Sequence, residues 1–192
     1  MEKVETTRHF CGIIFRLVSG VIPMPTEAEL RLHRCCFTGH RPEKLNCPEE
    51  RVKALLDAAV RQAVEDGFTT FITGMARGVD IWAGQTVLKL RAQNPAIKLV
   101  AASPYKGFED RWSDAWKEQY SFLIQWADAV RYICPGYSKG AFQKRNEWMV
   151  DRSSRVIAFY NGESGGTRNT IRYADSKGVQ VINLLQSERP YP

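Results

Sequence analysis

Three short segments place glycine beside a threonine or serine hydroxyl, at points where apolar runs end. They read FTGHR (37–41), TGMARGVD (73–80) and SGGTR (164–168). Glycine lets the backbone approach a phosphate closely, and the N–H groups of a following helical turn supply donors and partial positive charge. The arginines add full charges. The pattern predicts an anion site built from Thr38, Gly39, Arg41, Thr73, Gly74, Arg77, Gly78, Gly165, Gly166 and Thr167.

Each of these turns also has a simpler explanation, because a glycine often provides only the positive φ that a tight turn needs. The coincidence of three such turns favours a binding role. The segment TGMARG matches neither the G-x-G-x-x-G dinucleotide fingerprint nor a Walker loop, which needs a lysine after its last glycine. Ordinary nicotinamide and NTPase sites are therefore disfavoured.

Asp80, Ser103 and Asn146 complete the predicted binding set. Asp80 stands in the first turn of a predicted helix, where a carboxylate is favourable in any case. Alternatively, it accepts a hydrogen bond from a ribose hydroxyl or orients Arg77. Ser103 ends the third predicted strand. Asn146 lies inside a predicted helix, where asparagine has no advantage.

The stretch KGAFQKRNEWMVDRSS (139–154) places Lys139, Lys144, Arg145 and Arg152 among aromatic residues. Single-stranded nucleic-acid binders combine basic and aromatic side chains in this way. An amphipathic helix with Trp148 and Met149 in the core explains the pattern more simply. Tyr105, Phe108 and Trp112 also have two interpretations, as the wall of a base pocket or as ordinary core residues.

Catalytic and metal-binding groups are sparse in the sequence. With three histidines in the chain, a Ser-His-Asp triad is formally available only around His40, and the sequence has no G-x-S-x-G elbow. The five cysteines include no C-x-x-C pair, which disfavours a disulfide framework and a zinc ribbon. Cys35 and Cys36 suit a buried strand. We assign no catalytic residue and no metal site.

Length and composition indicate one globular domain with anionic partners. The chain has 192 residues, 44% of them hydrophobic, and a formal net charge of +6. A basic balance favours phosphates, nucleotides or nucleic acid, although a solvated basic surface gives the same value. No apolar run reaches the roughly 20 residues that a membrane span needs. We expect a cytoplasmic protein with no membrane contact.

We predict three regions along the chain: an N-terminal extension (1–33), a folded domain (34–187) and a C-terminal tail (188–192). The extension is expected to be disordered or partly spurious, with translation starting at Met24. From Arg34 onward, apolar runs alternate with helical periods of about 10 to 20 residues. Such spacing requires parallel crossovers, which predicts an α/β domain with a doubly wound, mostly parallel sheet and helices on both faces. In such folds, ligands bind beyond the carboxyl ends of the strands.

Four ordered segments give the chain a close resemblance to the YpsA-like branch of the SLOG superfamily. They are CCFTGHRPEKL, FITGMARGVDIWAGQTVLKLR, KRNEWMVDRSS and GGTRNTIRYADSKG, and the resemblance runs from about Arg34 to Leu185. It implies a Rossmann-like fold that binds nucleotides or nucleotide-derived ligands. Relatives in the superfamily include the LOG phosphoribohydrolases, which release bases from nucleoside monophosphates, and DprA, which loads single-stranded DNA.

The resemblance also implies roles for individual residues. Gly39 and Arg41 match the glycine and arginine after the first strand of the superfamily. Its G-x-A-R-G-x-D helix start is matched by Gly74, Arg77, Gly78 and Asp80, and its second glycine-rich turn by Gly165, Gly166 and Thr167. In LOG enzymes that turn reads P-G-G-x-G-T and precedes a catalytic glutamate. Here SGGTRNTIR lacks the second glycine step and places Arg172 near the position of the acid, which disfavours hydrolysis of the LOG type.

Three functions are therefore carried forward. The leading hypothesis is a binding protein for a nucleotide or a nucleotide-derived ligand of the NAD or ADP-ribose type, with a sensor role as one form. The second is a DprA-like protein that binds single-stranded nucleic acid. The third is a LOG-like hydrolase of nucleoside monophosphates that uses a displaced carboxylate, Glu163 or Asp80. Cofactor identity, enzymatic activity and assembly into a homo-oligomer stay open.

Overall fold

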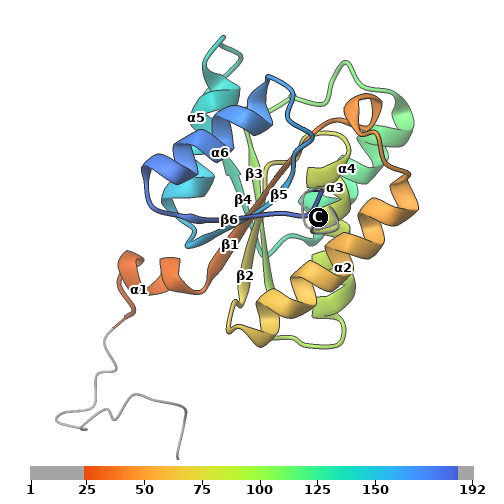
Figure 1. Cartoon of the computed structure of the whole chain (residues 1–192). Coiled ribbons are helices and arrows are strands. Elements are labelled where there is room, and N and C mark those ends of the chain that lie inside the picture. The colour runs from red at the N-terminus through yellow and green to blue at the C-terminus, as the bar shows by residue number, and fades with distance from the viewer. Residues whose placement is uncertain (1–23, 186–192) are drawn as a thin grey trace, which may run out of the picture.

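A single six-stranded sheet forms the centre of the molecule (Figure 1). The structure is a computed structural model that describes residues 24–185. Its strands are β1 (Arg34–Gly39), β2 (Thr70–Thr73), β3 (Lys98–Ser103), β4 (Ala129–Tyr132), β5 (Arg155–Phe159) and β6 (Gln180–Asn183). All neighbouring strands pair in parallel, in the order β4-β3-β2-β1-β5-β6. The predicted doubly wound α/β fold is confirmed, with a sheet that is parallel throughout.

Helices cover both faces of this sheet (Figure 1). The elements are α1 (Glu27–Leu32), the 3₁₀ turn η1 (Pro42–Lys44), α2 (Glu49–Glu65), α3 (Val79–Arg91), α4 (Asp114–Trp126), α5 (Ala141–Asp151) and α6 (Gly166–Ser176). α2, α3 and α4 lie on one face, and α5 and α6 on the other. The strand order therefore reverses between β1 and β5, and the chain crosses to the other face at this point.

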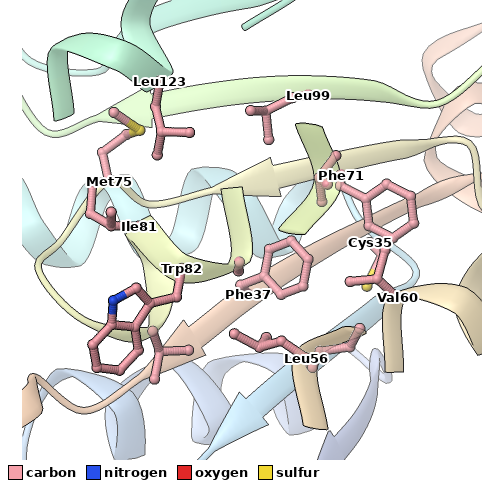
Figure 2. Packing of buried hydrophobic residues seen from close by; sticks show 14 of the residues in the cluster. Cys35, Phe37, Leu56, Val60, Phe71, Met75, Ile81, Trp82, Leu99 and Leu123 are labelled. Carbon is pink, nitrogen blue, oxygen red and sulfur yellow. The ribbon is translucent and has the colours of Figure 1, made fainter. Parts of the chain in front are cut away.

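The larger core lies between the sheet and the α2–α3 layer. Cys35 and Phe37 of β1 point toward Leu56 and Val60 of α2 (Figure 2). The ring of Phe37 stacks on that of Phe71 in β2, with centroids 6.1 Å apart. α2 packs this way because its apolar residues recur every three or four positions, which gives the helix one buried stripe.

A smaller core lies between the sheet and the α5–α6 layer. Cys36 of β1 belongs to it, together with Met149 and Val150 of α5 and Ala174 of α6. Both cysteines of β1 are fully buried, as predicted, and burial raises the pKa of both thiols. β1 is thus packed on both faces, which fixes the position of the residues that follow it.

A short helix occupies part of the predicted N-terminal extension. α1 begins with a capping box, in which the Thr26 hydroxyl accepts from the N–H of Glu29 and the Glu29 carboxylate accepts from the N–H of Thr26. Glu27 also forms an ion pair with Arg34 at 2.6 Å. Residues 27–32 are therefore helical in the structure, while the division of the chain into three regions stays a prediction. The predictions for residues 1–23 and for the tail 188–192 lie outside the described residues.

No helix within residues 24–185 combines the length and the apolar character that a bilayer crossing requires.

Candidate functional site

A cavity of about 440 Å³ opens at the carboxyl edge of the sheet, where the strand order reverses. This volume is within the usual range for small-molecule sites, and the position is the one at which open α/β sheets bind ligands. The walls come from the segment after β1, the start of α3, the loop after β3, α5 and the start of α6. The lining residues are Phe37, Thr38, Gly39, His40, Arg41, Glu43, Lys44, Ala76, Asp80, Phe108, Phe142, Arg145, Asn146, Ser164, Gly165, Gly166 and Thr167.

The end of β1 forms the floor of this cavity. Gly39 is required here because α3 begins directly against it: a Cβ at residue 39 would lie only 2.5 Å from the side chain of Val79. Thr38 is buried, and its hydroxyl has no hydrogen-bond partner within residues 24–185. Arg41 is exposed at the mouth of the cavity and forms no ion pair with any described acid.

The start of α6 forms the opposite wall. Its N-cap is Gly165, which has no side chain to cap the first-turn N–H groups. Gly165 and Gly166 are exposed to the cavity, and the N-terminal end of the helix carries partial positive charge. Thr167 is 5% exposed and Asn146 of α5 is 7% exposed. Neither side chain has a hydrogen-bond partner in the described part of the chain, and the polar atoms of both are open to the cavity.

A buried ion pair closes the back of the cavity. Nη1 of Arg145 lies 3.2 Å from Oδ2 of Asp80 and also donates to the carbonyl of Gly74. Asp80 accepts the N–H of Ala76 at 3.2 Å as well. Burial raises the pKa of Asp80, although the Arg145 guanidinium and the Ala76 N–H act in the opposite direction.

Arg145 had no place in the predicted binding set. A spacing signal was present, because Arg145 stands four residues from both Ala141 and Met149, which are buried on the same stripe of α5. The prediction of an amphipathic helix is confirmed, with Met149 in the core and Trp148 partly buried against it. The basic stretch therefore divides into a buried Arg145 and an exposed Lys139 and Lys144.

Five residues of the predicted set do not line the cavity: Thr73, Gly74, Arg77, Gly78 and Ser103. Thr73 donates to the carbonyl of Asp80 at 2.5 Å, and Gly74 accepts from the buried guanidinium described above. Both thus support the cavity from behind. Their direct contact with a ligand stays a prediction.

The remaining three of these residues have structural partners. Arg77 pairs with Glu43 at 3.1 Å, whereas the ion-pair partner of Asp80 is Arg145. Gly78 has a φ of 87°, a conformation that favours glycine, and faces η1. Ser103 donates to the carbonyl of Tyr105 and accepts the Tyr120 hydroxyl at 2.9 Å, which holds the loop after β3 against α4.

One end of the cavity is aromatic. Phe108 and Phe142 line it, and their rings meet edge to face with centroids 5.5 Å apart. Of the three aromatic residues predicted as wall or core, Phe108 reaches the cavity, whereas Tyr105 and Trp112 pack behind it. An aromatic base would find apolar edges at this end.

The carboxylates considered for hydrolysis are held in other contacts. Asp80 is engaged with Arg145 and the Ala76 N–H, and Glu163 is exposed, 3.9 Å from Nζ of Lys44. Across residues 24–185, no cluster of three His, Cys, Asp or Glu side chains has the arrangement of a metal site.

Comparison with known proteins shows the family of the chain. Residues 35–183 match the family model described as the YpsA ("YspA") SLOG family. The chain belongs to this SLOG family. The match covers β1 to β6 and confirms the resemblance seen in the four sequence segments.

Two relatives of this YpsA SLOG protein show how far the sequence similarity extends. A UPF0398 protein of Oceanobacillus iheyensis is 30% identical over 138 residues, which cover 68% of this chain and 74% of the relative. The SPbeta prophage-derived protein YoqJ of Bacillus subtilis is 37% identical over 116 residues, covering 54% of this chain and 68% of YoqJ.

Solved structures similar to the YpsA SLOG domain include two DNA processing proteins A. That of Streptococcus pneumoniae has a TM-score of 0.56 at 20% identity; the match covers 79% of this chain and half (50%) of the pneumococcal chain. That of Helicobacter pylori, which binds single-stranded DNA, has a TM-score of 0.56 at 19% identity and is covered over 66% of its length. At these identities the likeness concerns the fold.

Proposed function

We propose that the protein binds a nucleotide or nucleotide-derived ligand in the cavity at the carboxyl edge of the sheet. The observation that carries this proposal is a set of largely buried polar side chains whose hydrogen-bonding groups are unpaired and open to one cavity. Thr38, Asn146 and Thr167 line one cavity, and none of them has a hydrogen-bond partner within residues 24–185. Because these groups are unpaired and open to the cavity, a polar ligand can form hydrogen bonds with all three.

The charges around the cavity support an anionic group at the start of α6. The uncapped first turn of α6 offers N–H donors, and Arg41 and Lys44 line the same cavity. Arg41 has no acidic partner in the described residues, whereas Nζ of Lys44 lies 3.9 Å from a carboxylate oxygen of Glu163. A phosphate or pyrophosphate fits this end.

The opposite end of the cavity supports an aromatic base. Phe108 and Phe142 supply apolar surface there, while the side chains of Thr38 and Asn146 lie in the polar part. A ligand with an anionic group, a polar middle and an aromatic base matches this order, and AMP, ADP-ribose and NAD all have it. A role as a sensor of such a ligand stays a prediction.

The test is isothermal titration calorimetry with AMP, ADP-ribose and NAD. We expect wild type to bind at least one of them, and Thr167→Val to weaken that binding roughly tenfold, because the variant loses a hydrogen bond but keeps its shape. Arg41→Ala should weaken binding by a similar factor and reduce its dependence on salt.

Arg172→Ala is the matched control, because Arg172 is an exposed arginine of α6 that does not line the cavity. Its affinity should equal that of wild type. The proposal fails if none of the three nucleotides binds at millimolar concentration, or if Arg41→Ala and Arg172→Ala bind equally well.

A second candidate function is binding of single-stranded nucleic acid. Lys139 and Lys144 are exposed, form no ion pair with a described residue and flank Phe142, which reaches the cavity. Phosphate contacts of this kind must weaken steeply with salt. Fluorescence anisotropy with a labelled oligothymidylate tests it: a Lys139→Ala, Lys144→Ala double variant should lose binding at low salt. Absence of binding by wild type at low salt removes this candidate.

A further inference from the structure

The buried pair of Asp80 and Arg145 has hydrogen-bonding groups that the protein itself does not use. Oδ2 of Asp80 accepts from the N–H of Ala76 and from Nη1 of Arg145, each at 3.2 Å, and Nη1 also donates to the carbonyl of Gly74. These contacts occupy one oxygen of the carboxylate and one nitrogen of the guanidinium. Within residues 24–185, Oδ1 of Asp80 and Nη2 of Arg145 have no hydrogen-bond partner.

Both of these free atoms are open to the candidate site. Asp80 and Arg145 are each 5% exposed, and both line the cavity. The unpaired atoms that are fully enclosed include Nε of Arg145, but neither its Nη2 nor Oδ1 of Asp80. The small exposed part of each side chain therefore includes its free atom. The pair presents an acceptor beside a donor to the cavity, and the contacts behind the pair hold both in place.

The chemistry of the pair limits what a ligand can place against it. Burial raises the pKa of Asp80, whereas the Arg145 guanidinium and the Ala76 N–H favour its charged form. A charged carboxylate only accepts hydrogen bonds, and a guanidinium only donates them. The ligand must therefore offer a donor beside an acceptor. A phosphate does not fit, because it has only acceptors and carries the same sign of charge as Asp80.

The pair lies beside the aromatic surface on which we place the base. Arg145 stands three residues after Phe142 in α5, so the two side chains lie on the same side of the helix, and both line the cavity. Phe142 and Phe108 form the aromatic end. A planar base packed against these two rings can direct one edge toward Asp80 and Arg145.

The bases differ in whether such an edge is available. Adenine has an amine donor directly beside a ring-nitrogen acceptor, whereas guanine has a carbonyl oxygen in place of the amine. Hypoxanthine shares this oxygen. Cytosine repeats the adenine pattern on a smaller ring, which covers less of the apolar surface at the aromatic end. Adenine is therefore the base that matches both the pair and the aromatic end.

We propose that Oδ1 of Asp80 accepts a hydrogen bond from the exocyclic amine of an adenine, while Nη2 of Arg145 donates to the neighbouring ring nitrogen. The cavity then selects adenine nucleotides over nucleotides of guanine and hypoxanthine. This inference rests on the proposed function and deepens it, because it names the base and the two residues that read it.

The experiment compares AMP with IMP and with purine riboside 5′-monophosphate by calorimetry at pH 7.5. All three ligands have the same sugar and phosphate. For wild type, purine riboside 5′-monophosphate should bind roughly tenfold more weakly than AMP, because it lacks the amine. IMP should bind weaker still, by roughly a hundredfold, because its carbonyl oxygen would face the carboxylate.

Asp80→Asn should reverse this preference. The amide oxygen of the variant can still accept from the N–H of Ala76, which places the amide NH₂ at the position of Oδ1. The variant then presents two donors and should bind IMP more tightly than AMP. Asp57→Asn is the matched control, because Asp57 is an acid of α2 that does not line the cavity. Its ratio of AMP affinity to IMP affinity should equal that of wild type.

Other results overturn the inference in distinguishable ways. If wild type binds AMP but binds IMP equally well or better, the proposed function stands and the reading of adenine by this pair is refuted. An Asp80→Asn variant that is folded in urea titration but keeps the wild-type ratio refutes it as well. If that variant does not fold, the three ligands with wild type still decide. If no nucleotide binds to wild type, the proposed function fails and this inference fails with it.

Discussion

The buried pair between Asp80 and Arg145 allows a sharp test of the structure at the cavity. Nη1 of Arg145 lies 3.2 Å from Oδ2 of Asp80, and the two side chains are 6% and 7% exposed. Asp80→Asn removes the negative charge while it keeps the shape of the side chain and an oxygen that accepts the N–H of Ala76. The guanidinium is then left charged in a buried place without its counter-ion.

Breaking a buried pair from one side costs about 3–5 kcal/mol, a large part of the about 5–15 kcal/mol by which domains are usually stable. With a slope of about 2 kcal/mol per M urea, the unfolding midpoint should fall by about 1.5–2.5 M. Urea titration followed by tryptophan fluorescence measures this shift. Asp57→Asn is the matched control, because Asp57 pairs with Arg61 and Lys89 at the surface. For Asp57→Asn we expect the free energy of unfolding to fall by less than about 1 kcal/mol.

A second variant separates charge from packing. Both side chains are almost fully buried, so each charge depends on the other in place of water. Asp80→Asn combined with Arg145→Met removes both charges and should recover most of the lost free energy of unfolding. About 1 kcal/mol should remain lost, because the Gly74 carbonyl no longer has the Arg145 guanidinium as its donor. The reasoning is refuted if Asp80→Asn costs no more than Asp57→Asn, or if the double variant is less stable than Asp80→Asn alone.

Three further predictions concern the surroundings of the cavity. Gly39→Ala should lower the free energy of unfolding in urea by about 1–3 kcal/mol, because the new Cβ would lie 2.5 Å from the side chain of Val79. Adding Val79→Ala should recover most of this loss. An unchanged unfolding midpoint for Gly39→Ala would contradict the close approach. Wild type should lose stability as the pH falls below about 6.5, because the pKa of His40 is lowered in the folded state and the unfolded chain therefore binds the proton more readily. Melting temperatures at pH 7.5 and 5.5 should differ less for His40→Phe than for wild type, and equal differences would argue against a neutral buried ring. Tyr120→Phe should cost about 1 kcal/mol, since it removes the 2.9 Å hydrogen bond to Ser103, and should leave nucleotide affinity unchanged; a change in affinity would place the loop after β3 in the site.

The strands and helices could be predicted from the sequence because the signals that set them are local. The apolar run of β1 and the three-to-four spacing of Val52, Leu56 and Val60 are both contained in a few consecutive residues. The presence of α1 was missed because its helix is short and has no buried residue. Its capping box, from Thr26 to Glu29, was the signal available.

The candidate site could be predicted only in part because its walls depend on strand order. Every strand of a parallel sheet ends at the same edge, so the sequence offered residues after β1, β2, β3 and β5 alike. The order β4-β3-β2-β1-β5-β6 places the reversal between β1 and β5. Thr38 and Thr167 therefore line the cavity, while Thr73 and Ser103 form hydrogen bonds behind it. No local pattern contains this order.

The contact between Asp80 and Arg145 has a consequence for how the molecule opens. Asp80 belongs to the helical layer on one face of the sheet and Arg145 to the layer on the other, so the pair fastens the two layers together over the carboxyl edge. A local opening that detaches α5 must separate Asp80 from Arg145 and leave both charges unpaired in the gap that it creates. Amide hydrogens at the start of α3 and in α5 should therefore exchange with solvent in one cooperative event, and a ligand seated beside the pair would slow the exchange of both.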